Sequence, residues 1–232
     1  MPQTKLIEFI NFSDVENLLP PTPTSKMLPQ WYKDIESYLP ESKKEVMEKD
    51  GNKQSTIKKC VPVFDSLTAG YFFVTGADLE ITQENGIPLF TWACLDMIKF
   101  HPLQQLSNYP GAGPHAVPKL NNSWGYKTPK GYSCLFIPPM NRDNEIVVLP
   151  AIVDTDTFNH PVNFPFLLKN PNYEGLIPKG TPIVQIIPFK RDGWRNKVIQ
   201  KDFKARSKIE YILNSVFRDG YRNNFWQKKE YK

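Results

Sequence analysis

The sequence has little of what disulfide frameworks and zinc centres are built from. Only three cysteines occur among 232 residues, widely spaced and without a Cys-x-x-Cys pair. The odd count and the spacing argue against both kinds of site. Apolar residues flank each cysteine, so we expect buried thiols at Cys60, Cys94 and Cys134. We predict no bound metal and no cofactor.

Histidine is equally scarce, with His101, His115 and His160 as the only three. They stand in Phe-His-Pro, Pro-His-Ala and Asn-His-Pro contexts, without the short spacing that is typical of metal ligands. If the fold brought them together, they would suit a cupin-like metal-dependent oxygenase, which stays open as an alternative function.

Long apolar runs are absent as well. No run approaches the 18 residues that predict a transmembrane helix, so we expect no membrane partner. Residues 1–10 lack the apolar stretch of a secretory signal. The expected compartment is therefore the cytoplasm.

Proline is abundant, with 22 residues spread along the chain without a repeat. This distribution favours many short strands and turns over disorder. Three segments follow from the pattern: an extended N-terminal arm over residues 1–56, a β domain over residues 57–195, and a basic C-terminal segment over residues 196–232. A stretch near residues 102–130, rich in Pro, Gly and Asn, predicts a long surface excursion inserted in the β domain.

Short β-rich runs recur through the chain. In the arm, one strand is expected at residues 6–12 and a helical turn within residues 31–38. The strands expected in the β domain are 61–64, 71–74, 79–82, 89–95, 131–137, 146–153, 162–168 and 183–189. The interior Pro165 indicates an edge strand or a bulge.

The C-terminal segment predicts one amphipathic helix. Asp202 is a plausible N-cap and Gly220 a plausible end. Between them, apolar residues recur at helical spacing, at Phe203, Ile209, Ile212, Leu213, Val216 and Phe217. Residues 189–232 carry 13 basic and 5 acidic residues, a net charge of +8. Nucleic acid is one partner that such a charge allows, but a solvated helical face is the favoured interpretation.

Two aspartates mark the candidate site. Asp154 ends a predicted strand, and residues 155–159 form a tight turn that can admit a flat ring. Asp154 can orient or deprotonate a water molecule, and Asp156, two residues on, can face the same site. Phe158 lies in that turn, and we expect it to contact the ligand. The alternative is a turn whose aspartates bond their own backbone. Gln185, in the middle of an apolar strand, is expected to tie two chain segments together.

Four segments in order resemble motifs of the dUTPase and dCTP-deaminase family, which has the β-clip fold. The resemblance is close over residues 131–191 and partial over residues 68–74. The segments are Thr68-Ala-Gly-Tyr71, the strand from Gly131 into Pro139-Met-Asn-Arg142, Ala151-Ile-Val-Asp-Thr-Asp156, and Lys179-Gly-Thr-Pro-Ile-Val-Gln-Ile186.

The resemblance implies a mainly β, dUTPase-like β-clip domain and a homo-oligomer, most often a trimer with sites at subunit boundaries. It adds Tyr71, Asn141 and Arg142 as ligand-binding candidates. The whole chain also resembles an uncharacterised family of marine viruses and bacteria, which implies the host cytoplasm if the protein is viral and carries no function with it.

Departures from the family pattern affect the phosphate-binding groups. Phe72 replaces the aspartate of the first motif, and Met140 to Asp143 replace the arginine and serines of the second. The Gly-rich C-terminal phosphate loop is missing. We therefore expect a protein that binds or acts on a nucleotide or nucleoside-like small molecule without ordinary dUTPase activity. The alternative is a non-enzymatic binding or assembly protein that retains the fold alone.

Overall fold

The computed structural model describes residues 5–14, 18–39, 55–93, 97–106, 108–113, 116–200, 206–210 and 220–232. The chain divides into two compact units. The first comprises residues 1–24 and 70–191, and the second comprises residues 25–69 and 192–232. Within the described residues, 14 strands form four antiparallel sheets, so the protein is mainly β.

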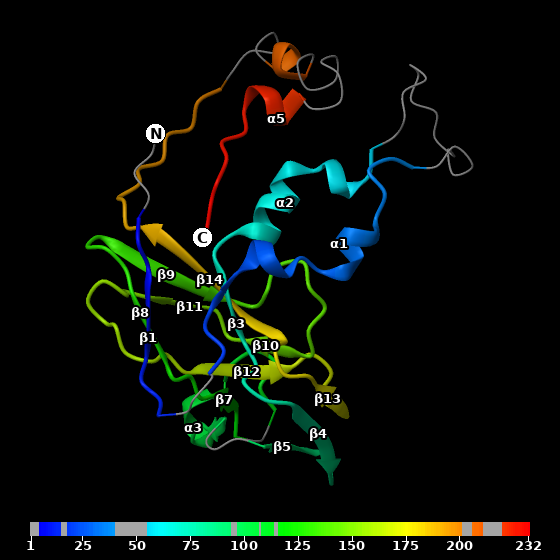
Figure 1. Ribbon diagram of the computed structural model, residues 1–232, viewed down its shortest axis with the longest axis vertical. Helices are drawn as coiled ribbons and strands as arrows, with labels where there is room; N and C mark the ends of the chain where they lie inside the picture. The colour runs from blue at the N-terminus through cyan, green and yellow to red at the C-terminus, as the bar shows by residue number, and fades with distance from the viewer. Residues whose placement is uncertain are drawn as a thin grey trace. The chain divides into compact units, whose positions relative to one another are not determined.

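A five-stranded sheet forms the centre of the first unit, in the order β11-β9-β14-β3-β2 (Figure 1). Its longest strand, β14, lies between β9 and β3, and five consecutive residues from Pro182 are buried. A central strand is covered on both faces, which is why its sequence reads as a continuous apolar run. The five strands are β2 (Thr22–Pro23), β3 (Tyr71–Val74), β9 (Tyr132–Ile137), β11 (Ala151–Val153) and β14 (Pro182–Lys190).

A second sheet has four strands in the order β10-β12-β7-β6. They are β6 (Ile98–Phe100), β7 (Pro118–Leu120), β10 (Ile146–Val148) and β12 (Phe164–Leu168). The sequence predicted a single strand over residues 146–153, but Leu149 and Pro150 divide it into β10 and β11, which belong to different sheets. A proline has no N–H for a ladder, so the chain changes sheets there.

Pro165 lies in an interior strand with no register shift, which corrects the prediction of an edge strand or a bulge. The residues of β12 from Phe166 onwards pair with β10, whereas Phe164 and Pro165 pair with β7. The carbonyl of Pro165 still accepts a hydrogen bond from the N–H of Leu149 at 2.8 Å. The two neighbours therefore use different halves of β12, and this arrangement accommodates the missing donor.

Two smaller sheets complete this unit. The hairpin of β4 and β5 turns at Asn85 and Gly86, both with positive φ, as in type I′ turns. The strands are β13 (Gly175–Ile177), β4 (Leu79–Glu84) and β5 (Ile87–Trp92) in one sheet, and β1 (Glu8–Asn11) and β8 (Trp124–Lys127) in the other. A short helix, α3, spans Leu103–Leu106.

Part of the stretch near residues 102–130 is core, which corrects the prediction of a surface excursion. It supplies β7 and β8, and four of its large side chains are buried: Val117, Leu120, Trp124 and Tyr126. Tyr126 stacks edge-to-face on Phe136 of β9, with ring centroids 5.1 Å apart. Strands of three or four residues between Pro- and Gly-rich turns are too short to show the alternation of apolar and polar residues that predicts a strand.

The described residues of the second unit form short helices, apart from one isolated bridge between Tyr38 and Ser55. The helices are α1 (Gln30–Asp34), the 3-10 helix η3 (Ile57–Lys59), α2 (Val61–Thr68), residues 206–210 and α5 (Gly220–Asn224); another 3-10 helix, η1 (Thr24–Met27), begins at the boundary with the first unit. Helix α1 agrees with the predicted helical turn. The carboxylate of Asp65 in α2 accepts a hydrogen bond from the indole N–H of Trp226 and forms an ion pair with Lys229.

Helix α2 corrects the strand predicted at residues 61–64. Pro62 lies at the first turn of the helix, where a missing N–H costs no hydrogen bond. The β-branched Val61 and Val63 favoured a strand, but the stretch continues as a helix through Asp65 to Thr68.

The predicted C-terminal helix falls mostly outside the described residues. Residues 206–210 are helical, and Gly220 begins α5 rather than closing a helix. Ile209 is exposed, although the prediction placed it on an apolar face. Asp202, Phe203, Ile212, Leu213, Val216 and Phe217 lie outside the described residues. None of the described helices is long and apolar enough to cross a membrane.

Candidate functional site

Strand register brings Asp154 to one end of the five-stranded sheet. Val153 of β11 pairs with Cys134 of β9, so the next residue, Asp154, comes opposite Ser133. The hydroxyl of Ser133 donates to Oδ1 of Asp154 at 2.7 Å. A residue on the neighbouring strand thus fixes this carboxylate.

Arg191 reaches the same place from the other side of β9. Lys190 of β14 pairs with Tyr132, and the N–H of Arg191 donates to the carbonyl of Gly131 at 2.9 Å. Its guanidinium Nη1 lies 2.9 Å from Oγ of Ser133, 3.1 Å from Oδ1 of Asp154 and 2.9 Å from Oδ1 of Asp156. We call Gly131, Ser133, Asp154, Asp156 and Arg191 the Arg191 cluster.

Asp156 is the closed member of this cluster. Its two carboxylate oxygens pair with Nη1 and Nη2 of Arg191, and the N–H of Gly131 donates to Oδ2 at 2.8 Å. The hydrogen bond from Arg191, reinforced by the one from Gly131, lowers the pKa of Asp156 to about 2. Its side chain is 4% exposed. Asp156 therefore holds the Arg191 side chain and the backbone at Gly131 together.

Asp154 is the open member. Its side chain is 62% exposed, and both of its hydrogen bonds end on Oδ1. In the described part of the chain no hydrogen bond reaches Oδ2. The guanidinium and the hydroxyl therefore orient a carboxylate whose second oxygen faces solvent, where it can accept a hydrogen bond from a ligand or a water molecule.

A tight turn follows Asp154. The carbonyl of Asp154 accepts the N–H of Thr157 at 3.1 Å and that of Phe158 at 2.9 Å. Phe158 is 47% exposed, and its ring centroid lies 5.6 Å from that of His160. The turn agrees with the one expected from the sequence, and it carries an exposed aromatic face close in the chain to the open carboxylate.

Below the turn, the packing is closed. Thr155 is fully buried and shares a hydrogen bond of 2.8 Å with Thr128, and its hydroxyl donates to Sγ of Cys134 at 3.4 Å. Burial raises the pKa of Cys134 to about 11. The expectation of a buried thiol is met at Cys134, Cys60 is half-buried, and Cys94 lies outside the described residues.

Tyr71 lies in the core rather than on a surface. It is 6% exposed, and its ring packs edge-to-face on Phe9 at 5.0 Å. The glycine before it has φ +75°, and a Cβ there would lie 2.0 Å from the carbonyl oxygen of Ile186. The Ala-Gly-Tyr segment therefore has a packing reason: only glycine lets β3 approach β14 at Gly70.

Asn141 and Arg142 lie near the opposite end of β9. The N–H of Met140 donates to Oε1 of Gln185 at 2.9 Å, so Gln185 ties two chain segments together, as predicted. Arg142 lies over the ring of Phe72, 4.9 Å from its centroid, and partial burial lowers its pKa. Asn141 has φ +56°.

The candidate residues therefore form two groups. Asp154, Asp156 and Phe158 lie at the Ser133 end of β9, whereas Asn141 and Arg142 follow its Ile137 end. Ser133 and Ile137 are four positions apart in the strand, a span of about 13 Å. Within one chain the structure does not bring Arg142 to Asp154.

Sequence reasoning missed Ser133 and Arg191. Both stand in strands that were predicted, or directly after one, so a correct register between β9, β11 and β14 would have identified them. That register depends on pairings between residues as far apart as 133 and 189. A single sequence does not specify such pairings.

Metal ligands do not gather among the described residues, where no three His, Cys, Asp or Glu side chains form a group. His101 Nδ1 lies 2.7 Å from Oε1 of Gln105, and His160 packs on Phe12 and Phe158. His115 lies outside the described residues.

No protein-family model matches the chain, and no curated protein matches it either. The Arg191 cluster offers an oriented carboxylate oxygen, an exposed ring follows four residues further along the chain at Phe158, and the one guanidinium of the cluster is bonded to two carboxylates.

Proposed function

We propose that the protein binds a nucleoside-like small molecule at the Arg191 cluster and does not hydrolyse a nucleoside triphosphate. The observation that carries this proposal is the Asp154 carboxylate, which Ser133 and Arg191 orient while its second oxygen stays open. An oriented acceptor suits the N–H and O–H donors of a base or a sugar.

The aromatic face of the turn supports a ring-bearing ligand. Phe158 is exposed two residues beyond Asp156, and flat rings pack well on aromatic side chains. The open carboxylate supplies direction, and the ring supplies apolar contact. This combination of a few placed polar groups with apolar surface is typical of small-molecule sites.

Phosphate chemistry is disfavoured by the way the cations are used. Arg191 is bonded to two carboxylates, and Arg142 lies over Phe72 with its pKa lowered by burial. Stabilising a triphosphate in a transition state needs positive groups and donors aimed at its oxygens. We therefore propose a dUTPase-like β-clip fold without the ordinary dUTPase reaction.

The test is a thermal-shift panel of matched nucleosides and their triphosphates. A nucleoside at 100 times its dissociation constant stabilises the protein by about 2.7 kcal/mol. We expect stabilisation by at least one nucleoside, and its loss in Asp154→Asn. Asp34→Asn is the matched control, because Asp34 is an exposed aspartate in α1 of the other unit, bonded to Gln30.

Two results would contradict this proposal. One is a panel in which no nucleoside shifts the melting temperature. The other is pyrophosphate release from dUTP at an enzymatic rate that disappears in Asp154→Asn, because that would show that triphosphate chemistry survives at this carboxylate.

We propose homo-oligomeric assembly as a second function, as the trimer that the family resemblance implies, and a separate observation supports contact between copies of the chain. All residues from 191 to 200 are exposed, and Trp194 and Val198 are 90% and 93% exposed. Monomeric proteins rarely leave large apolar side chains so open in one segment, so the segment suits contact with another copy of the chain. Light scattering at micromolar concentration tests it: we expect a trimer that Trp194→Ser weakens, and a monomer would refute it.

A further inference from the structure

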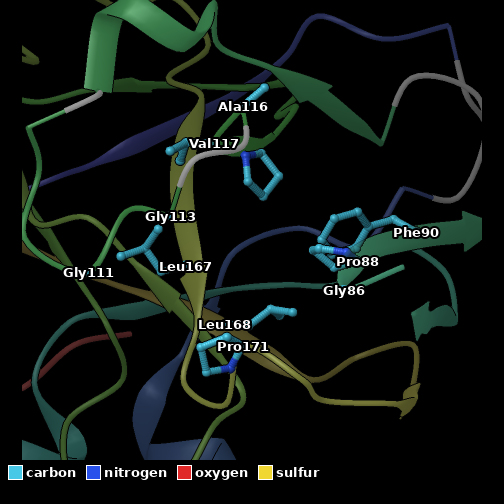
Figure 2. Close-up of a pocket in the computed structure, with 11 residues that line it drawn as sticks. Gly86, Pro88, Phe90, Gly111, Gly113, Ala116, Val117, Leu167, Leu168 and Pro171 are labelled. Atoms are coloured by element: carbon cyan, nitrogen blue, oxygen red, sulfur yellow. The ribbon is translucent and has the colours of Figure 1, made fainter. Parts of the chain in front are cut away.

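The first unit contains an apolar pocket that is separate from the Arg191 cluster. It has a volume of about 210 Å³ and lies between β5, β12 and the chain around residues 111–118. Figure 2 shows Pro88 and Phe90 on one side and Gly111, Gly113 and Leu167 on the other. We call it the Phe90 pocket.

The lining has one chemical character. The eleven described residues that line it are all glycine, alanine, proline, valine, leucine or phenylalanine, so none of these side chains carries a charge or a hydrogen-bonding group. A charged group placed against this lining would lose part of its hydration and meet no charged side chain among the described residues. The described lining therefore favours uncharged ligands.

The aromatic wall is held in place. The Phe90 ring packs edge-to-face on Phe166, with centroids 5.7 Å apart, and lies 6.3 Å from the ring of Phe100. Pro88 and Phe90 are two residues apart in β5 and so face the same side of the strand. One flat ring and one proline ring thus form a fixed surface for a planar molecule.

The part of the lining at Pro171 is tied to the same hairpin. Gln83 pairs with Pro88 across β4 and β5, and its side-chain amide donates to the carbonyls of Pro171 and Tyr173, both at 3.1 Å. Pro171 lines the pocket. Hydrogen bonds within the protein therefore hold Pro171 in place relative to the hairpin, and a ligand would not have to order this part of the lining.

Glycine keeps part of the rim open. A Cβ placed on Gly113 would meet no atom within 4 Å, and the same holds for Gly86. An engineered cavity of about 150 Å³ lined by Leu, Ile and Phe binds benzene. The Phe90 pocket is somewhat larger and has similar walls.

We propose that the Phe90 pocket binds a small, uncharged aromatic compound of one or two fused rings. The proposal does not depend on the function of the Arg191 cluster, because the two sites share no residue. Indole is the probe, since it is planar, bicyclic and uncharged. Indole-3-carboxylate is the charged comparison.

The experiment measures indole binding to the full chain by saturation-transfer NMR and by thermal shift. We expect saturation transfer to the indole ring protons and a rise in melting temperature. Indole-3-carboxylate should bind much more weakly than indole. Asp154→Asn should leave indole binding unchanged, which separates this test from that of the proposed nucleoside site.

Two filling variants locate the site. Leu167→Trp enlarges a side chain that lines the pocket, and Gly113→Leu adds one at the open rim. Both should abolish indole binding while circular dichroism stays that of the wild type. If Leu167→Trp does not fold, Gly113→Leu decides. Leu176→Trp is the matched control, because Leu176 is an exposed leucine of β13 outside the pocket.

Three results would overturn the proposal. They are an absence of indole binding at millimolar concentration, binding that survives in the folded filling variant, and equal binding of indole and its carboxylate. The first two would refute the site, and the third would refute the class of ligand.

Discussion

The Arg191 cluster and the Phe90 pocket belong to the same unit but differ in the polarity of their side chains. In the cluster, four polar side chains bond one another, and Oδ2 of Asp154 is the carboxylate oxygen that no described residue reaches with a hydrogen bond. In the pocket, none of the eleven described lining side chains has a polar group, and the empty volume is the feature that a ligand can use. Polar networks are therefore costly to disturb, whereas apolar pockets tolerate occupants of suitable shape.

Both regions depend on the core between them, and this gives the largest expected effect. Phe136 of β9 is 1% exposed and packs on Tyr126 and on Phe164 of β12. Phe136→Ala should lower the free energy of unfolding by about 3–5 kcal/mol, through lost contacts and a residual cavity. Urea denaturation measures it. Phe158→Ala, at an exposed phenylalanine, should change the free energy by no more than about 0.5 kcal/mol.

Substitution of the two aspartates of the cluster should lower the stability of the protein by different amounts. Asp156→Asn removes a carboxylate that pairs with both guanidinium nitrogens of Arg191, so we expect the melting temperature to fall by several degrees. Asp154→Asn keeps an oxygen that can accept from Ser133, and its site is open to water, so its effect should be much smaller. Equal effects in differential scanning calorimetry would contradict the division into a closed and an open carboxylate.

The same division predicts a pH dependence. The folded-state pKa of Asp156 is lowered from 3.8 to about 2, mainly by Arg191. Its contribution to stability is therefore present above about pH 4 and is lost as the pH falls through about 2. The difference in unfolding free energy between wild type and Asp156→Asn should be constant from pH 5 to 7 and shrink below about pH 4. Urea titrations across this range measure the difference, and one that grows in acid would refute the assignment.

The smallest expected effect concerns Cys134, beneath the cluster. Its thiol is fully buried and its pKa is raised to about 11, so little thiolate forms at pH 8. Cys134 should remain unalkylated by iodoacetamide in the native protein and react once the protein is unfolded. Peptide mapping by mass spectrometry distinguishes Cys134 from the other cysteines. Rapid alkylation of Cys134 in the native state would show that the Thr128–Thr155 layer opens.

Several elements could be predicted because their signals are local. The strands at Tyr71–Val74 and Tyr132–Ile137, the turn after Asp154 and the tie made by Gln185 all agree with the structure. Each depends on a short apolar run, a turn-forming residue or a buried amide that needs a partner. Such signals act over a few residues and do not require the rest of the chain.

Other elements could not be predicted because they depend on distant pairings. Helix α2 has β-branched residues that favoured a strand, and the short strands β7 and β8 are recognisable only through their partners β12 and β1. Arg191 joined the candidate site only when β14 was placed beside β9. The Phe90 pocket likewise has no motif, because its walls come from residues between 86 and 171.

The sequence by itself determined the mainly β character of the protein, the position of the Asp154 turn and the scarcity of metal ligands. These follow from composition and from patterns of two to six residues. Only the tertiary structure decided that Asp156 is closed and Asp154 open, that Tyr71 is core, and that an apolar pocket lies beside β5. The physical reason is that burial and hydrogen-bond partnership are set by strand register, and register is a property of pairs of segments far apart in the chain.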